Sequence, residues 1–297
     1  MTQIYILIKR NVKLFFKDKA MFFTALITPA ILLVLYATFL GKIYRDSFIS
    51  AMPEGVTLPS DIINALAGGQ LVSSILAVSC VTVAFCSNFL MVQDKALGIR
   101  KDFTASPVKP SVLSLSYYAA TLFSTLIICL SAAAICLIYL AVVGWYLSVA
   151  DVLLLFLDVL LLVLFGTAIS SVISYFLSTQ GQISAVGSVI SAGYGFICGA
   201  YMPISSFGEG LQKVVTFLPG TYGTSLLRNH AVNGALAEAE KQSAPKEVVD
   251  ALRDMLDCNL YFFDKKVSEP MMYIVLFSWV IVLIGVYVLL NKIKKKK

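Results

Sequence analysis

Charge is what this sequence of 297 residues has least of, since only 13% of its residues are charged and 59% are hydrophobic. A soluble domain usually has about 25% charged and about 45–50% apolar residues, so there is too little charge here to cover a soluble globule. The apolar residues also come in long runs rather than in alternating patterns. The composition therefore excludes a soluble enzyme, a disordered protein and a disulfide-stapled secreted domain, and it indicates a protein whose solvent is largely lipid.

Several chemical motifs are also missing. The sequence has no Gly-x-x-x-x-Gly-Lys-Ser/Thr phosphate-binding loop, so we expect no ATPase site of the usual kind. It has no His-Glu-x-x-His motif and a single histidine, His230, which cannot build a typical zinc site and is interpreted as an ordinary polar residue of an outer loop. Only Cys258 of six cysteines lies outside the apolar runs, which leaves no pair for an external disulfide. We therefore expect no catalytic residue, no metal and no cofactor on this chain.

Six apolar runs are long enough to cross a bilayer as helices, which takes about 20 residues. They lie near residues 21–40, 66–92, 112–143, 150–177, 183–202 and 271–290. The first is interpreted as a retained span, because it is longer than a signal peptide's apolar core and no small-residue cleavage site follows it. We predict an all-α polytopic membrane protein with six transmembrane helices.

Lysine and arginine gather in three segments, which lie before the first run, after the second and after the last. These segments hold 14 basic residues against three acids, Asp18, Asp94 and Asp102. Because basic residues stay on the cytoplasmic side, six crossings with both termini in the cytoplasm fit every loop. The lysines of the tail 294–297 are interpreted as a topological anchor against anionic lipid, and no nucleic-acid partner is expected.

Two cytoplasmic segments have patterns of their own. Residues 2–19 predict an amphipathic helix in the membrane interface. Its apolar side would contain Ile4, Leu7, Ile8, Val12 and Phe15, and its basic side Lys9, Arg10, Lys13 and Lys17. The loop 93–109 is short and highly charged. Either a short helix that meets a soluble partner or a solvated connector fits this loop.

Two runs carry stripes of small or polar residues. In the fifth run a small residue at every fourth position lets another helix approach closely: Gly187, Ser191, Gly195 and Gly199. The second run has a polar or small stripe that either lines a pathway or packs against a neighbour: Gln70, Ser74, Ala77, Val81, Ala84 and Asn88.

Asp158 lies about two turns inside the fourth run, where a central charge costs roughly 2.5–3.5 kcal/mol. It is therefore expected to face the bundle, either with a structural partner or as part of a pathway. Glycines and prolines interrupt the apolar stretch 199–228, which suits a re-entrant or interfacial segment. After Pro245, the spacing of Val248, Val249 and Leu252 predicts a small external helix that rests on the bundle.

Two segments resemble the membrane (permease) subunit of type-2 ABC transporters, the ABC-2 family of bacterial exporters. The first segment comprises Asp94-Lys95-Ala96-Leu97-Gly98, Phe103 and Pro107-Val108-Lys109. The second comprises Gly199 to Pro203, Pro219-x-Thr221-Tyr222 and Arg228. Asp94 stands where the family more often has Glu, and Ile99 where Thr is common.

The resemblance implies a half-transporter in the bacterial plasma membrane. Its implied partners are a second permease subunit, identical or related, and two copies of a separate ATPase subunit that binds ATP and Mg. Residues 1–20 would be a connecting helix, and residues 21–297 a six-span domain with a coupling loop at 93–111 and an external region at 203–270. The implied ATPase-coupling residues are Asp94, Lys95, Gly98, Arg100, Lys101 and Phe103. The implied cavity-lining residues are Gln70, Ser74, Ala77, Asn88, Gly187, Ser191 and Gly195, and the implied outer gate contains Pro203, Pro219 and Tyr222.

The expected function is ATP-driven export of a lipophilic or amphipathic small molecule, antibiotic or peptide by alternating access. A permease for polysaccharide or lipid-linked export is an alternative within the same family. Outside it, an ion-gradient-driven secondary transporter would use Asp158 as its coupling carboxylate. A polytopic membrane enzyme is a third interpretation, which the missing catalytic motifs weaken.

Overall fold

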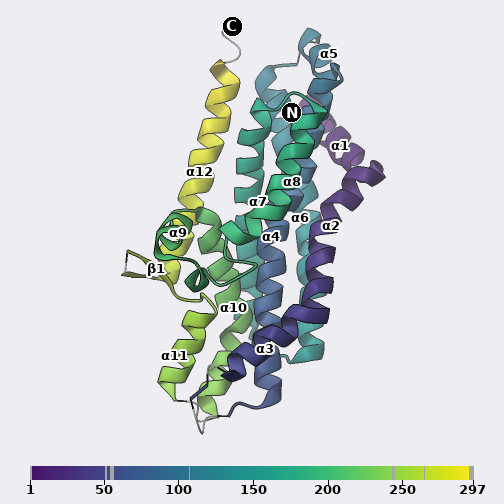
Figure 1. The fold of residues 1–297 in the computed structure, drawn as a ribbon. Coiled ribbons are helices and arrows are strands. Elements are labelled where there is room, and N and C mark those ends of the chain that lie inside the picture. Colours follow the sequence, from purple (N-terminus) through teal and green to yellow (C-terminus); the bar gives the residue numbers. More distant parts are fainter. Residues whose placement is uncertain are drawn as a thin grey trace.

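The computed structural model describes residues 2–50, 52–53, 57–106, 108–242, 245–263 and 265–293. These residues form an elongated helical bundle with one small hairpin (Figure 1). Its first half comprises α1 (Thr2–Lys17), α2 (Lys19–Leu35), a π-helical turn (Tyr36–Leu40), α3 (Gly41–Ser50), α4 (Ser60–Ala96), α5 (Ile99–Ala105) and α6 (Pro110–Val143). Its second half comprises α7 (Val149–Phe176), α8 (Gln180–Ile197), a 3-10 turn (Ile204–Ser206), α9 (Glu209–Val215), α10 (Pro219–Lys241), α11 (Lys246–Met255), β1 (Leu260–Phe262), β2 (Lys265–Val267) and α12 (Glu269–Ile293).

The chain is an all-α polytopic membrane protein. Within the described residues, five helical segments are long and apolar enough to cross a membrane: Lys19–Ser50, Ser60–Ala96, Pro110–Val143, Val149–Phe176 and Glu269–Lys292. They coincide with five of the six predicted spans. The remaining prediction, 183–202, falls on α8, which has 18 residues and opens with two polar side chains, Gln180 and Gln182. That helix is therefore a shorter and less apolar element than the sequence predicts.

Local signals explain where several helices begin. Asp18 caps α2 by accepting a hydrogen bond from the Met21 backbone N–H at 3.1 Å. Ser148 and Thr179 each open their helices, α7 and α8, with a reciprocal capping box. Pro110 occupies the first turn of α6, where a missing backbone N–H costs nothing.

Helix α4 is the central element of the bundle. Its most apolar stretch is entirely buried, and α2, α6, α7, α8 and α10 all pack against it. Two glycines allow the closest of these approaches. A Cβ atom at Gly69 of α4 would lie 2.7 Å from the carbonyl oxygen of Ala231, and one at Gly166 of α7 would lie 2.7 Å from that of Cys80. Small residues thus let helix backbones come together where the chain is most tightly packed.

The two ends of the bundle differ in what they hold. The start of α1, the end of α12 and α5 lie at one end, which we call the α5 end (Figure 1). Helices α3 and α11 and the last turns of α10 lie toward the opposite end, the α11 end. Helices α8 and α12 reach only part of the way from the α5 end, and α9 and the β-hairpin lie at about the level where these two helices stop.

Candidate functional site

At the α5 end a buried carboxylate joins three helices. Asp94, near the end of α4, is 2% exposed and receives hydrogen bonds from both terminal nitrogens of Arg10 in α1, at 2.7 and 3.3 Å. The hydroxyl of Tyr117 in α6 donates to the same carboxylate at 2.5 Å. Burial lowers the pKa of Arg10, but Asp94 raises it, and the result lies above the ordinary value for arginine. This fork-shaped pairing fixes α1 against α4 and α6.

The amphipathic pattern predicted that Arg10 lies on the exposed face of α1 together with the lysines. That placement is wrong, because Arg10 contacts the buried Asp94. The face of α1 that packs on the bundle contains Leu7, Asn11 and Phe15, and Arg10 lies at its border. Lys9, Lys13 and Lys17 are exposed as predicted. The predicted apolar face is correct for Leu7 and Phe15, whereas Asn11 is buried among them at 1% exposure.

Lys95, the next residue after Asp94, ties α4 to the end of α7. Its ammonium group donates to the carbonyl oxygens of Ser174, Tyr175 and Leu177 at 3.3, 2.6 and 2.7 Å. The last carbonyls of a helix have no partner within it and carry the negative end of the helix dipole, so a lysine is well matched to this position. Asp94 and Lys95 thus point into the chain and not toward a soluble partner.

The chain then turns sharply into α5. Gly98 adopts a φ of 78°, a left-handed conformation that costs glycine little, and its α-carbon faces open space. Leu97 beside it is 70% exposed. Phe103 faces back toward the bundle, where its ring lies 5.1 Å from the guanidinium carbon of Arg10. The side chain of Lys101 and the whole of Pro107 lie outside the described residues, and Leu97 is the exposed large apolar side chain of this turn.

The polar stripe of α4 does not face an open cavity in this chain. Gln70, Ser74, Ala77 and Asn88 are each at most 1% exposed. The amide nitrogen of Asn88 donates to the hydroxyls of Ser170 and Ser171 at 3.2 and 3.1 Å, and its oxygen accepts from Thr121 at 3.4 Å. In the described conformation the stripe therefore packs between helices, and its role in lining a transport pathway stays a prediction.

The stripe of small residues on α8 is also partly used within the chain. A Cβ at Gly187 would lie 3.2 Å from the ring of Phe89, and one at Gly195 would overlap the ring of Tyr201. Ser191 differs, because it lines a groove of about 580 Å³ between α2 and α8. The other groove residues are mostly apolar, with hydroxyl groups from Thr24, Thr28 and Ser188. Of the seven residues predicted to line a cavity, only Ser191 lines this open groove.

The loop after α8 is held by a buried ion pair. Arg228 of α10, 1% exposed, donates to Asp257 at 3.1 Å and to the carbonyl oxygen of Gly199 at 2.9 Å. The Asp257 carboxylate also accepts from the backbone N–H of Ile204 at 2.9 Å. Burial raises the pKa of Asp257 above its usual value, against the opposing effect of Arg228. Gly199 and Arg228, separated by 29 residues, are thus parts of one structural unit.

The first membrane helix holds the same loop from its other side. The π-helical turn after α2 places Tyr36 so that its hydroxyl donates to the carbonyl oxygen of Ala200 at 3.0 Å. The ring of Tyr36 stacks on Tyr44 of α3, whose hydroxyl lies 3.5 Å from the carbonyl oxygen of Tyr201. A π-helical turn is uncommon and often marks a functional position. Here it aims two tyrosines at one loop.

The three residues predicted for an outer gate lie around this loop. Pro203 precedes the 3-10 turn, and Pro219 opens α10 with its ring in the first turn. Tyr222 is 5% exposed, and its hydroxyl donates to the carbonyl oxygen of Thr216 at 2.7 Å. The structure therefore brings these residues into one region between α8 and α10.

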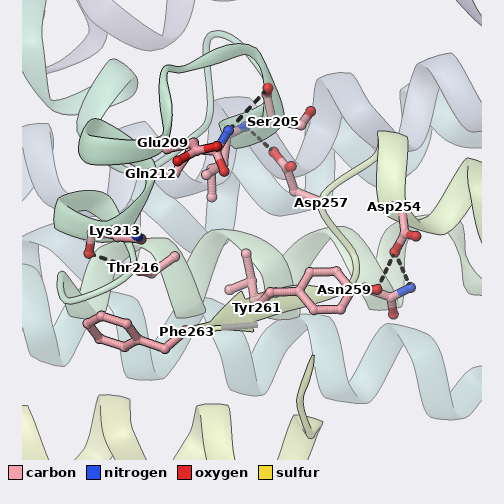
Figure 2. A pocket seen from close by; sticks show the side chains of 12 residues that line it. Ser205, Glu209, Gln212, Lys213, Thr216, Asp254, Asp257, Asn259, Tyr261 and Phe263 are labelled. Atoms are coloured by element: carbon pink, nitrogen blue, oxygen red, sulfur yellow. Dashed lines mark hydrogen bonds between the residues drawn. The ribbon is translucent and has the colours of Figure 1, made fainter. Parts of the chain in front are cut away.

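A cavity of about 590 Å³ opens beside this loop (Figure 2). One wall comes from the stretch 204–216 and the other from 254–263. Asp254 and Glu209 contribute carboxylates and Lys213 an ammonium group, while Tyr261 and Phe263 contribute aromatic rings. The two walls belong to separate elements that are joined at Asp257, so a movement of α9 would change the shape of this cavity.

Asp158 has structural partners that sequence reasoning missed. Its carboxylate lies 2.5 Å from Nδ1 of His230 in α10 and accepts from the hydroxyl of Tyr273 in α12 at 2.6 Å. Burial lowers the pKa of His230, but Asp158 raises it above its ordinary value. His230 is 5% exposed and sits inside a helix, so its interpretation as an ordinary loop residue is wrong.

Charged and polar side chains thus connect helices and loops both at the α5 end and around the loop after α8. Within the described ranges, no group of histidine, cysteine, aspartate or glutamate residues is arranged to hold a metal ion. A family model described as ABC-2 type transporter matches residues 2–230. No curated protein matches the chain.

Proposed function

The chain belongs to the ABC-2 type transporter family, and from that premise we propose that it is the membrane subunit of an ATP-driven exporter energised by a separate ATPase subunit. The observation that carries this proposal is the junction of α1, α4, α5 and α7 at the α5 end. Asp94 and Lys95 connect the base of α5 to α1 through Arg10 and to the end of α7 through three carbonyl oxygens. A force on α5 would therefore reach two other helices through charged hydrogen bonds.

The parts of this junction divide the proposed coupling role between them. Leu97 lies on the turn that meets the ATPase, while Asp94, Lys95, Arg100 and Phe103 face the bundle and transmit its movement. Gly98 provides the sharp turn that separates the two groups. We assign the α5 end to the cytoplasm, in keeping with the lysines and arginines that gather there.

Partway along the bundle, where α8 and α12 stop, the loop 198–206 and α9 act as the outer gate. Helix α12 has 25 residues and is therefore about 37 Å long. Most of this length is needed to cross a bilayer core of about 30 Å. The level where α12 begins is therefore the outer face of the membrane. The gate loop and α9 lie at that level, and α10 and α11 extend beyond it (Figure 1).

The groove between α2 and α8 is the wall of the export pathway, which a second permease subunit, identical or related, would complete. Its apolar lining with a few hydroxyl groups suits a lipophilic or amphipathic small molecule, antibiotic or peptide. Asp158 does not favour an ion-coupled transporter, since His230 and Tyr273 already bind its two oxygens. ATP and Mg bind to the two ATPase copies, and the complex resides in a bacterial plasma membrane.

A pair of matched substitutions tests the docking role. Leu97→Asp changes an apolar side chain that is 70% exposed at the α5 end, and Ile49→Asp makes the same kind of change at a 52% exposed site on α3. We expect Leu97→Asp to abolish co-purification of an ATPase and export activity without lowering the unfolding temperature. Ile49→Asp should leave ATPase association intact. Equal ATPase association in both variants would refute the docking role.

A further inference from the structure

A second groove lies on the face of the bundle formed by α2 and α6, with Ile75 of α4 at its base. Its volume is about 550 Å³, within the range of about 300–1,000 Å³ typical of ligand sites. All but one of its lining residues are apolar or aromatic, the exception being Ser131. Small residues, Ala30 and Ala132, create the hollow, while Ile127 and Ile135 on its rim are 50% and 59% exposed.

The length of this groove matches one leaflet of a bilayer. Along α2 its lining begins at Phe22 and ends at Leu33, which at 1.5 Å per residue is about 16 Å. Half of a bilayer core of about 30 Å is about 15 Å. The groove starts at the elbow between α1 and α2, where the rings of Phe16 and Phe22 lie 5.9 Å apart. It therefore has about the length of one acyl chain, and it begins at the elbow that leads into the amphipathic helix α1.

Three exposed lysines lie on α1 and α2 within a few residues of the rings that begin the groove. Lys13 lies one turn before Phe16, and Lys19 one turn before Phe22, so each lysine shares a helix face with a ring that lines the groove. Lys17, at the elbow itself, is exposed like the other two. The single nearby acid, Asp18, is engaged as the cap of α2. The start of α2 adds the positive end of a helix dipole.

We propose that this groove binds one anionic phospholipid of the leaflet at the α5 end. One acyl chain lies between α2 and α6, and the phosphate is held by Lys13, Lys17 and Lys19. The apolar groove matches the acyl chain of such a lipid, and the lysines at one end of the groove match its negatively charged phosphate. The bound lipid braces the elbow between α1 and α2, on the far side of α1 from Asp94. This site requires only that the chain lies in a membrane, so it stands independently of the export role.

Native mass spectrometry on the full-length chain in detergent, with any co-purifying subunits, tests the site. Phosphatidylglycerol and phosphatidylcholine of the same chain length are titrated in parallel. We expect one phosphatidylglycerol to be retained with higher affinity than phosphatidylcholine. Lys13→Gln and Lys19→Gln should each weaken phosphatidylglycerol binding about fivefold, which corresponds to about 1 kcal/mol for each basic residue near a membrane surface. Lys292→Gln, at an exposed position of α12, is the charge-matched control and should not weaken it.

The acyl-chain part of the site has its own pair of variants. Ala30→Trp fills the groove from an exposed position and should remove the retained lipid, while Ala134→Trp changes an exposed alanine of α6 outside the groove and should not. Equal retention of the two phospholipids would overturn the proposal. So would undiminished phosphatidylglycerol binding by Ala30→Trp, because the lipid would then bind by its headgroup alone.

Discussion

Asp94 can show whether the base of α5 is a docking surface for the ATPase or an internal joint, by which we mean a contact that holds α1, α4 and α6 together within the chain. Both roles predict lost transport when its charge is removed, but they differ in what happens to the chain itself. The substitution Asp94→Asn keeps the size of the side chain and removes the charge that Arg10 and Tyr117 share. An internal joint would lose stability, whereas a docking surface would lose only its partner.

The expected size of the effect follows from the burial of this pair. The Asp94 side chain is 3% exposed and that of Arg10 is 27% exposed. Removing one partner of a fully buried ion pair costs about 3–5 kcal/mol, and a hydrogen bond to a charged group contributes about 1.5–3 kcal/mol. Because water still reaches Arg10, the cost should fall below that of a fully buried pair and within the range for a hydrogen bond to a charged group. We expect Asp94→Asn to reduce the free energy of unfolding by about 2–3 kcal/mol.

The assay is a double-mutant cycle with Arg10→Gln, measured by thermal unfolding of the full-length chain in detergent. Since the two residues contact each other directly, their effects should not add, and the double variant should be less destabilised than the sum of the two single variants. ATPase co-purification is measured on the same preparations. A chain that keeps its full stability as Asp94→Asn but loses the ATPase would refute the internal joint and restore Asp94 as a docking residue.

Two further variants address other parts of the bundle. Gly166→Ala places a Cβ atom 2.7 Å from the Cys80 carbonyl oxygen and should lower the free energy of unfolding by about 1–3 kcal/mol. Gly285→Ala in α12 is the control, because its new Cβ atom meets nothing within 4 Å. Equal melting temperatures of the two variants would show that α4 and α7 are not in close contact. His230 should make stability depend on pH. Its raised pKa means that the charged pair with Asp158 contributes fully below the ordinary value of 6.5, and that this contribution is lost as pH rises through the raised value in the folded chain. Thermal unfolding between about pH 5.5 and pH 9 should therefore show a loss of stability that His230→Gln lacks, and parallel curves would contradict the pairing.

Spans and helix starts are local properties, and for that reason the sequence predicts them well. Apolar runs marked five of the spans, and Pro245 with the spacing of Val248 and Leu252 predicted α11. The amphipathic pattern of residues 2–19 predicted a helix, but it assigned Arg10 to the wrong neighbours. Arg10 finds its partner 84 residues away in the chain. Helical periodicity shows which residues share one face of a helix. It does not show which residues elsewhere in the chain contact that face.

The roles of buried polar groups were harder to predict, because a helix that packs against another helix and a helix that lines a pathway both carry small and polar residues. The stripe with Ser74 and Asn88 has small and polar side chains, as a pathway would, yet in this chain it lies between helices. Asp158 was expected to need a partner inside the bundle, and a signal for that partner was present. His230 is the single histidine of the chain, and a buried acid in an apolar helix is best matched by a group that can carry the opposite charge.

From Gln70 we predict a second conformation of the chain besides the described one. It is 1% exposed, and within the described residues neither its amide nitrogen nor its amide oxygen has a hydrogen-bond partner. Each such orphaned group costs about 1–3 kcal/mol, so its presence in the most buried helix favours a second state in which water or a transported molecule reaches it. We expect Gln70→Leu to raise the unfolding temperature and to slow export or change which compounds are exported. Asn88→Leu is the matched control, since Asn88 has three partners and its replacement should lower stability. A destabilised Gln70→Leu would mean that the amide is already satisfied in the closed chain, and the argument for an open state at this position would fail.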